Sequence, residues 1–402
     1  MALYYGRKAI RRVPGIVIKA APIPKPELTE GFGTREQVGP ICAQSGFDSV
    51  LFVTDETLFG LGLHEKVVQS LKDHNIRYSI FHKIDSEPTV DIVKEGVKAA
   101  VECQADCIVA LGGGSVLDSC KIIAAGARHP KLPLRHYLHK FAVVEGGSIP
   151  LINIPSTAGT GAECTVGAVI KNKRGTKNAT VLIGLDVANV ILDSELLIGA
   201  PKSVTSWCAI DALSHGLEGL LADVSSTDED IRKSRECVKL IFENLPILLE
   251  EPKNTDARQA TMLAAYYGGN AINTQLAGYV HAFAHSIGAL YHIPHGKAIA
   301  WCLVPIISAQ EHLRYEEMAD LARYCGMASE TDPAETAADK LIGSLKDLLD
   351  LCGLEKGCEL LKEKDYDKLT KMINADSINY SPSRTFTDDD IKTLLDQIRR
   401  GY

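Results

Sequence analysis

The chain has 402 residues, and its 43 Lys and Arg against 51 Asp and Glu give a formal net charge of −8 at pH 7. This length suits about two to three domains, and the acidic balance argues against a protein whose main task is to hold nucleic acid. With 46% hydrophobic and 23% charged residues, the composition is that of a water-soluble globular protein and excludes disordered, collagen-like and small disulfide-stapled classes.

The cysteines favour a reducing compartment. There are eleven of them, scattered along the chain with no C-x-x-C pair, and an odd, scattered set in a long chain does not predict a disulfide framework. The first residues lack the apolar core of a secretory signal, and no uncharged apolar stretch is long enough to span a bilayer. We therefore expect a cytoplasmic protein without a membrane or nucleic-acid partner.

Apolar runs of strand length alternate with amphipathic stretches of helical length in the first half of the chain. This pattern predicts a parallel sheet covered by helices on both faces, whereas residues 128–148 are expected to form a long loop or flap. The predicted strands are 49–54, 78–81, 107–111, 151–154 and 189–192, and the predicted helices are 34–46, 64–74, 89–104 and 113–126.

The pattern changes after Asp193, where long segments with a period near 3.6 residues follow one another without a clear strand. A capped helix is predicted to start at residues 226–231, and Pro246, Pro252 and Pro333 are expected to separate helices. The sequence thus predicts an α/β domain over 1–195 and an all-helical domain over 196–402.

Two loops rich in small residues follow predicted strands. Residues 112–115 read GGGS between a strand and a helix, so free backbone N–H groups at the positive helix end could hold a phosphate. A tight strand-to-helix turn would also need glycine. Because residues 155–163 form a similar loop after another strand, a pyrophosphate crevice at the carboxyl ends of neighbouring strands is favoured.

Asp55 comes directly after a predicted strand. An acid there can accept a hydrogen bond from a ribose hydroxyl and would repel a 2′-phosphate, which favours NAD over NADP. The alternative is an Asp that only forms the turn.

Histidines gather in the helical half. His281, His285, His292 and His295 fall within 15 positions, and Asp211 and His215 are spaced i, i+4, which brings them onto one helix face. Burying so many polar rings without a shared partner is costly, so we expect a metal site. One carboxylate with several imidazoles suits Fe(II), Zn, Mn or Co, but spacing alone leaves open which three or four residues bind.

Four motifs together make the chain resemble the iron-containing (group III) alcohol dehydrogenase family over nearly its whole length. Residues 112–121 (GGGSVLDSCK) resemble the family's GGGSxxDxxK, residues 157–163 (TAGTGAE) its TAGTGSE, and residues 211–215 (DALSH) its DALxH. The most specific match is residues 278–296, GYVHAFAHSIGALYHIPHG, which are similar to the family's GxVHxxAHxLGxxxxxPHG.

The resemblance implies a dehydroquinate synthase-like architecture of two domains and assigns individual residues. The implied metal ligands are Asp211, His215, His281 and His295, and His285 is implied to lie in the site as a candidate proton relay or as a residue that orients His281. His292 falls at a variable position and is a candidate for the pocket wall. The implied cofactor contacts are Asp55, Gly112, Gly113, Gly114, Ser115, Asp118, Thr157, Thr160 and Lys177.

The implied function is reversible hydride transfer between a small primary alcohol or aldehyde and NAD(H), with Fe(2+), or alternatively Zn(2+), as a Lewis acid. A homodimer or higher homo-oligomer is also implied. Glu87 and Trp207 depart from the family pattern, which keeps open a zinc polyol dehydrogenase or a carbon–oxygen lyase of the same architecture. A catalytically silent nucleotide-binding module is the alternative from another functional class.

Overall fold

The computed structural model describes residues 23–84, 88–171, 177–222, 226–380 and 382–401. By its internal contacts the chain divides into two compact units, one over Ala21–Gly199 and one that contains Ala200–Tyr402. The division falls four residues beyond the boundary predicted between 195 and 196.

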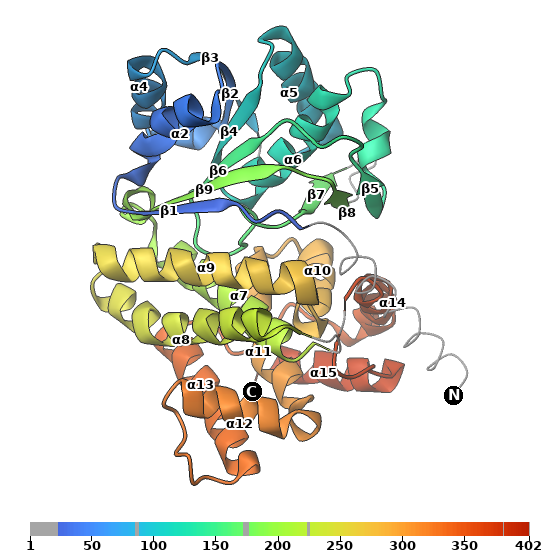
Figure 1. Cartoon of the computed structure of the whole chain (residues 1–402). Coiled ribbons are helices and arrows are strands. Elements are labelled where there is room, and N and C mark those ends of the chain that lie inside the picture. The colour runs from blue at the N-terminus through green and yellow to red at the C-terminus, as the bar shows by residue number, and fades with distance from the viewer. Residues whose placement is uncertain (1–22, 85–87, 172–176, 223–225, 381, 402) are drawn as a thin grey trace. The chain divides into compact units, whose positions relative to one another are not determined.

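The first unit is built on a six-stranded sheet in which all neighbouring strands are parallel, as predicted (Figure 1). The strand order is β1-β9-β6-β4-β2-β3. Its strands are β1 (Glu27–Gly31), β2 (Ser49–Asp55), β3 (Arg77–Ile84), β4 (Cys107–Gly112), β6 (Leu151–Pro155) and β9 (Val187–Asp193). The central strands β2, β4 and β6 are mostly apolar and buried along nearly their whole length, as expected for a parallel sheet with both faces covered.

Helices α2 (Val38–Ser45) and α4 (Glu65–Asp73) lie on one side of the sheet, and α5 (Val90–Glu102) and α6 (Gly114–Arg128) lie on the other (Figure 1). Phe52 of β2 packs with apolar side chains of α2 and α4 in a fully buried core. A 3-10 turn, Thr34–Gln37, precedes α2, and the short helix α3 (Glu56–Gly60) follows β2.

A second, three-stranded sheet was not predicted. Its order is β5-β8-β7, formed by β5 (Phe141–Val143), β7 (Gly167–Lys171) and β8 (Lys177–Ile183). The region predicted as a long loop therefore contains a strand and the 3-10 turn Leu134–Tyr137. The three-residue strand β5 is too short to produce a recognisable alternation, which explains why it was missed.

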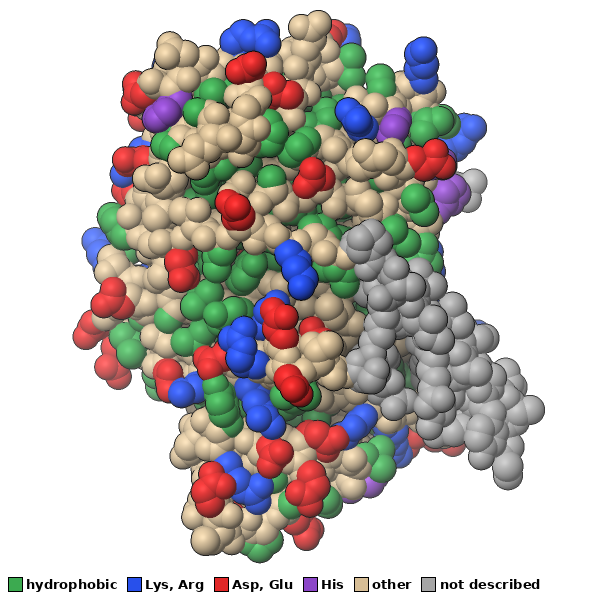
Figure 2. Space-filling model, viewed as in Figure 1, with side chains coloured by type: hydrophobic (Ala, Val, Ile, Leu, Met, Phe, Trp, Pro, Cys, Tyr) green, Lys and Arg blue, Asp and Glu red, His purple; other side chains and the backbone are tan. Residues whose placement is uncertain are grey.

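The described residues of the second unit form helices joined by turns and loops, with no strand among them, as the pattern predicted (Figure 1). Acidic and basic side chains are interspersed over the outer side of α8 and α9 (Figure 2), as in the i, i+4 pair of Glu229 and Lys233. The helices are α7 (Lys202–Leu220), α8 (Asp228–Glu250), α9 (Thr255–Gln275), α10 (Tyr279–Tyr291), α11 (His295–Ser308), α12 (Tyr315–Tyr324), α13 (Ala334–Leu351), α14 (Tyr366–Ser377) and α15 (Asp388–Arg400).

Helix α8 confirms one prediction and contradicts another. Thr227 caps α8 through a reciprocal bond pair with Asp230, which confirms the predicted helix start. Pro246, however, lies inside α8, so the prediction that it separates two helices is wrong. Buried Leu245 and Leu248 on either side of it hold the helix in place by tertiary packing.

None of the helices in the described ranges combines the length and the apolar character needed to cross a bilayer.

Candidate metal centre and dinucleotide loops

Helix α7 carries the first two predicted ligands. Asp211 and His215 are both buried, and their i, i+4 spacing places them on the same side of the helix. The Nε2 atom of His215 lies 3.8 Å from the Oδ1 atom of Asp211.

Helices α10 and α11 bring the other two. His281 lies in the first turn of α10, and His295 is the first residue of α11, directly after Pro294. The connection between these helices turns at His292, which adopts a left-handed conformation with φ of 56°. This places His292 at the C-cap of α10, and its predicted part in the pocket wall stays a prediction.

The start of α11 lies close against α7. A Cβ atom added to Gly296 would lie 2.6 Å from the Cβ atom of Trp207, so only glycine allows this approach. Trp207 therefore helps to set the position of the helix that carries His295. Glu87, the other departure from the family pattern, lies outside the described residues.

Ligand atoms of Asp211, His281 and His295 all lie within 4.8 Å of one another. Oδ1 of Asp211 is 3.6 Å from Nε2 of His281 and 3.2 Å from Nε2 of His295. His215 lies outside this tightest group, but its ring stacks on that of His281 with centroids 4.7 Å apart. The structure thus brings together the four residues that the family motif assigns.

The donor set fits a divalent cation. Oδ1 of Asp211 and Nε2 of His281 are buried and have no hydrogen-bond partner among the described residues, an arrangement that costs free energy unless something else satisfies both atoms. Two ligand atoms each ~2.1 Å from one tetrahedral ion lie roughly 3.4 Å apart. The separations around Asp211 match that value, so these atoms can share an ion.

The electrostatics favour a cation as well. Burial opposes the ionised form of Asp211, but the neighbouring His215 and His295 outweigh it and hold its pKa well below the ordinary value. Burial also opposes a charged His281, yet Glu218 and Asp211 outweigh that effect and raise its pKa to about 10. Without a metal, a protonated His281 therefore lies between two carboxylates, and a bound cation would take over the role of that charge.

Glu218 is a residue of this site that the sequence reasoning missed. Its Oε2 atom lies 2.5 Å from Nδ1 of His281, and its Oε1 atom accepts a 2.6 Å bond from the backbone N–H of Val280. The signal was present, because Glu218 lies seven residues after Asp211, on the same side of α7.

His285 lies beside the cluster, with its ring centroid 5.1 Å from that of His295 and 43% of its side chain exposed. Its Nδ1 atom is 3.0 Å from Oδ2 of Asp376 and 3.0 Å from the Tyr380 hydroxyl, which also donates to Asp376. Sequence reasoning missed both partners, since they lie more than 90 residues further along the chain. Nδ1 of His281 has a carboxylate partner in Glu218, and both roles suggested for His285 stay predictions.

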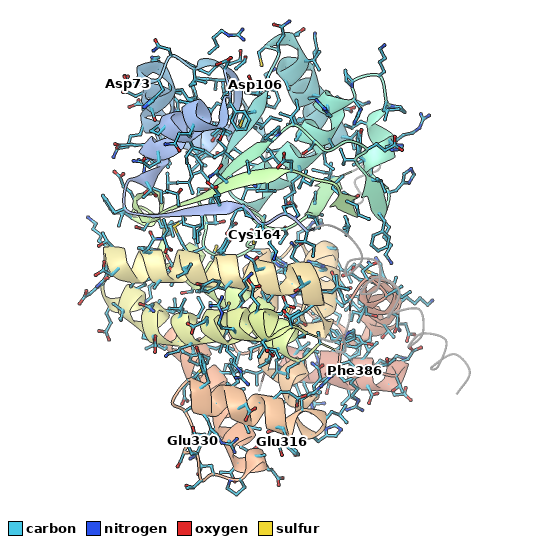
Figure 3. All side chains as sticks on the ribbon, viewed as in Figure 1. Asp73, Asp106, Cys164, Glu316, Glu330 and Phe386 are labelled. Carbon is cyan, nitrogen blue, oxygen red and sulfur yellow. The ribbon has the colours of Figure 1, made fainter. Side chains whose placement is uncertain are left out.

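In the α/β unit the two predicted loops lie side by side. Strand β4 ends at Gly112 and α6 begins at Gly114, and β6 pairs with β4 up to Pro155. Cβ atoms added at Gly113 and Gly114 would lie 3.5 Å from Thr157 and 3.2 Å from Thr160. The loop with both threonines continues to the buried Cys164, which is labelled in Figure 3. The N-terminal end of α6 next to two hydroxyls forms a surface suited to a phosphate.

Other predicted cofactor contacts have partners within the unit. Asp55 caps α3 by accepting a 2.8 Å bond from the N–H of Leu58. Asp118 contacts the buried Lys121 at 3.0 Å and accepts a bond from Val169. The backbone oxygen of Ser115 accepts a bond from Ser119, within α6.

The cofactor roles of Asp55, Asp118 and Ser115 stay predictions. The side chain of Lys177 lies outside the described part of the chain, so its predicted contact is also untested.

The chain is similar to proteins of known sequence and structure. It is 28% identical to the bifunctional aldehyde-alcohol dehydrogenase of Escherichia coli K12, over 83% of this chain and 40% of that protein, so it spans about two fifths of that relative. It is 29% identical to the NAD-dependent methanol dehydrogenase of Bacillus methanolicus, over 92% of this chain and 97% of the relative. A crystal structure of a 1,3-propanediol oxidoreductase superposes with a TM-score of 0.87 at 27% identity, covering 94% of this chain and 99% of that one.

Two family models match the chain in succession. The model of the iron-containing alcohol dehydrogenases matches residues 25–193, and the model of the C-terminal part of the same family matches residues 205–399. Together these matches cover both compact units. The chain belongs to the iron-containing alcohol dehydrogenase family.

Proposed function

We propose that this protein is a metal-dependent oxidoreductase that transfers a hydride reversibly between a small primary alcohol or its aldehyde and NAD(H). The observation that carries the proposal is the group of Asp211, His281 and His295, in which two buried polar atoms lack a hydrogen-bond partner among the described residues. The names of the methanol dehydrogenase and the 1,3-propanediol oxidoreductase support a small alcohol as substrate.

The proposed metal is Fe(2+), with Zn(2+) as the alternative. Asp211, His281 and His295 would hold it, with His215 as the fourth ligand after a small movement toward Asp211. A divalent ion in this position supplies Lewis acidity toward the substrate oxygen. One carboxylate and three imidazoles suit either ion, so metal content has to be measured rather than inferred from the ligands.

The proposed cofactor is NAD(H), which supplies the hydride chemistry. The backbone at Gly113 and Gly114, with Thr157 and Thr160 beside it, would bind the phosphates. The preference over NADP(H) is assigned to Asp55, whose carboxylate would repel a 2′-phosphate. We expect Asp55→Gly to bring the kcat/KM values for NAD(H) and NADP(H) closer together. An unchanged ratio of the two values would refute this assignment.

His285 is the proposed proton carrier. An imidazole with Asp376 and Tyr380 on its Nδ1 side is held in one orientation and can pass a proton between its exposed edge and solvent. A role for His285 in the chemical step predicts that His285→Asn lowers kcat more than it changes metal content.

Two further properties belong to the proposal. All eleven cysteines are free thiols, which supports a reducing compartment such as the cytoplasm. A homodimer is supported by the family resemblance, and light scattering of the purified protein tests it.

The deciding experiment is an anaerobic assay of NADH oxidation by Fe(2+)-loaded protein across small aldehydes, with Zn(2+)-loaded protein and polyol substrates in parallel. The expected result is aldehyde reduction with Fe(2+) that disappears in Asp211→Ala. Turnover of polyols with Zn(2+) alone would favour the zinc polyol dehydrogenase instead. Tight NADH binding without turnover of any substrate would contradict the proposal and favour a silent nucleotide-binding module.

A further inference from the structure

Glu218 contacts both a backbone N–H and a histidine side chain in the first turn of α10. Its carboxylate accepts bonds from the N–H of Val280 at 2.6 Å and from Nδ1 of His281 at 2.5 Å, and its side chain is 2% exposed. The acid belongs to α7, more than 60 residues earlier in the chain. One buried carboxylate therefore joins the helix of Asp211 to the helix of His281.

The start of α10 depends on this contact. Its N-cap residue is Gly278, which has no side chain to satisfy the free N–H groups of the first turn. A Cβ atom added at Gly278 would lie 2.6 Å from Oε1 of Glu218, so the glycine leaves room for a capping oxygen from another helix. At the same end of α10, Tyr279 packs against Phe386, which is labelled in Figure 3.

The chemistry of the two donors requires a carboxylate. Val280 N–H and His281 Nδ1–H both need acceptors, and an ionised Glu offers two oxygens, whereas Gln offers one oxygen and one NH₂ group. A Gln at this position has to leave the Val280 N–H unpaired or turn an NH₂ donor toward Nδ1. The second arrangement forces the proton of a neutral ring onto Nε2, the atom that faces Asp211.

We propose that Glu218 is the positioning residue that keeps the His281 proton on Nδ1, so that Nε2 is presented as a metal ligand, while the same carboxylate fixes the first turn of α10. The inference rests on the proposed metal site and adds to it a residue outside the four assigned ligands. A ligating imidazole whose second nitrogen donates to a carboxylate binds metal more tightly, and loss of such a partner typically costs about 10–100-fold in affinity.

The test compares wild type, Glu218→Gln and Glu218→Asp as full-length proteins, with Glu317→Gln as the matched control. Glu317 pairs with Arg314 at the start of α12, so the control removes one carboxylate charge from the same unit. Zn²⁺ affinity is measured by competition with a chelator, and the folded fraction of each metal-free protein is checked by thermal unfolding. In the Zn²⁺-loaded, ¹⁵N-histidine-labelled proteins, NMR detects the hydrogen-bonded Nδ1–H of His281 directly.

We expect Glu218→Gln to bind Zn²⁺ about 10–100-fold more weakly and to lose the downfield Nδ1–H resonance. Glu218→Asp, which keeps two acceptors on a shorter arm, should recover part of the affinity, and Glu317→Gln should behave as wild type. Wild-type Zn²⁺ affinity and an unchanged resonance in Glu218→Gln would overturn the role of Glu218 and leave the proposed metal site standing.

Two other results test the role of Glu218 and the proposed metal site even if Glu218→Gln does not fold. Absence of a hydrogen-bonded Nδ1–H in the Zn²⁺-loaded wild type would overturn the role of Glu218. Failure of the wild type to bind Zn²⁺ or Fe²⁺ would overturn the proposed metal site itself, so the two failures are distinguishable.

Discussion

Glu163 gives the sharpest stability prediction outside the metal centre. It closes the loop that contains Thr157 and Thr160, and only about 1% of it is exposed. Burial raises the pKa of its carboxyl from 4.5 to about 7, opposed in part by the charge of Lys121. The folded protein therefore favours the neutral form of an acid that is normally ionised.

The sign follows from proton binding. Between the unfolded pKa of 4.5 and the folded pKa of about 7, the folded state holds a proton that the unfolded state has released. Stability contributed by Glu163 is thus fully present below the lower pKa and falls as the pH rises through this window. At about 1.36 kcal/mol per pKa unit, the loss reaches about 3 kcal/mol at alkaline pH.

Urea unfolding of wild type and Glu163→Gln at about pH 5 and about pH 8 measures this effect, because Gln does not titrate. The stability of the variant relative to wild type should rise by about 2.5 kcal/mol between the two pH values. Glu102→Gln on α5 is the control, because it makes the same chemical change at the surface, where 65% of the Glu102 side chain is exposed. A difference between Glu163→Gln and wild type that stays constant with pH would refute the reasoning.

Two further substitutions test the geometry of the α/β unit by urea unfolding. Gly112→Ala should lower the free energy of unfolding by about 1–3 kcal/mol, because the new Cβ atom would lie 2.4 Å from Val116. Gly60→Ala is the control, because open space surrounds Gly60 and the steric loss should not appear there. Equal effects of the two substitutions would contradict the packing described. Asp193→Ala should cost about 3–5 kcal/mol, since it removes the 2.6 Å carboxylate partner of the buried Arg35 guanidinium and the acceptor of the Gly33 and Arg35 backbone N–H groups. Arg35 then keeps its 3.0 Å contact with the partly exposed Glu195. A loss below about 1 kcal/mol would show that this buried ion pair is not needed for stability.

Local spacing indicated a metal site in the helical half but did not fix its ligands. The i, i+4 pair Asp211 and His215 predicted one helix face, and the family motif was needed to assign His281 and His295 as its partners. Glu218 follows the same stripe and could have been found by extending the spacing by one turn. Asp376 could not, because its approach to His285 depends on how α14 packs against α10, which no local pattern contains.

The sheet shows the same division between local and tertiary information. Central strands such as β2 and β4 are buried along their length, so their apolar runs identified them. Edge strand β1 has a mostly exposed, mixed pattern and joins the sheet only by pairing with β9. Pro246 misled for a related reason, because packing of α8 outweighs the local preference of proline to end a helix.

Metal binding tests the central claim most directly. Metal-free wild type and Asp211→Ala are incubated anaerobically with Fe²⁺ or Zn²⁺, desalted, and analysed for bound metal per chain. We expect one tightly bound ion per wild-type chain and its loss in Asp211→Ala, with both proteins folded. Equal metal content in the two proteins, or none in wild type, would contradict the claim that Asp211, His281 and His295 form a metal centre.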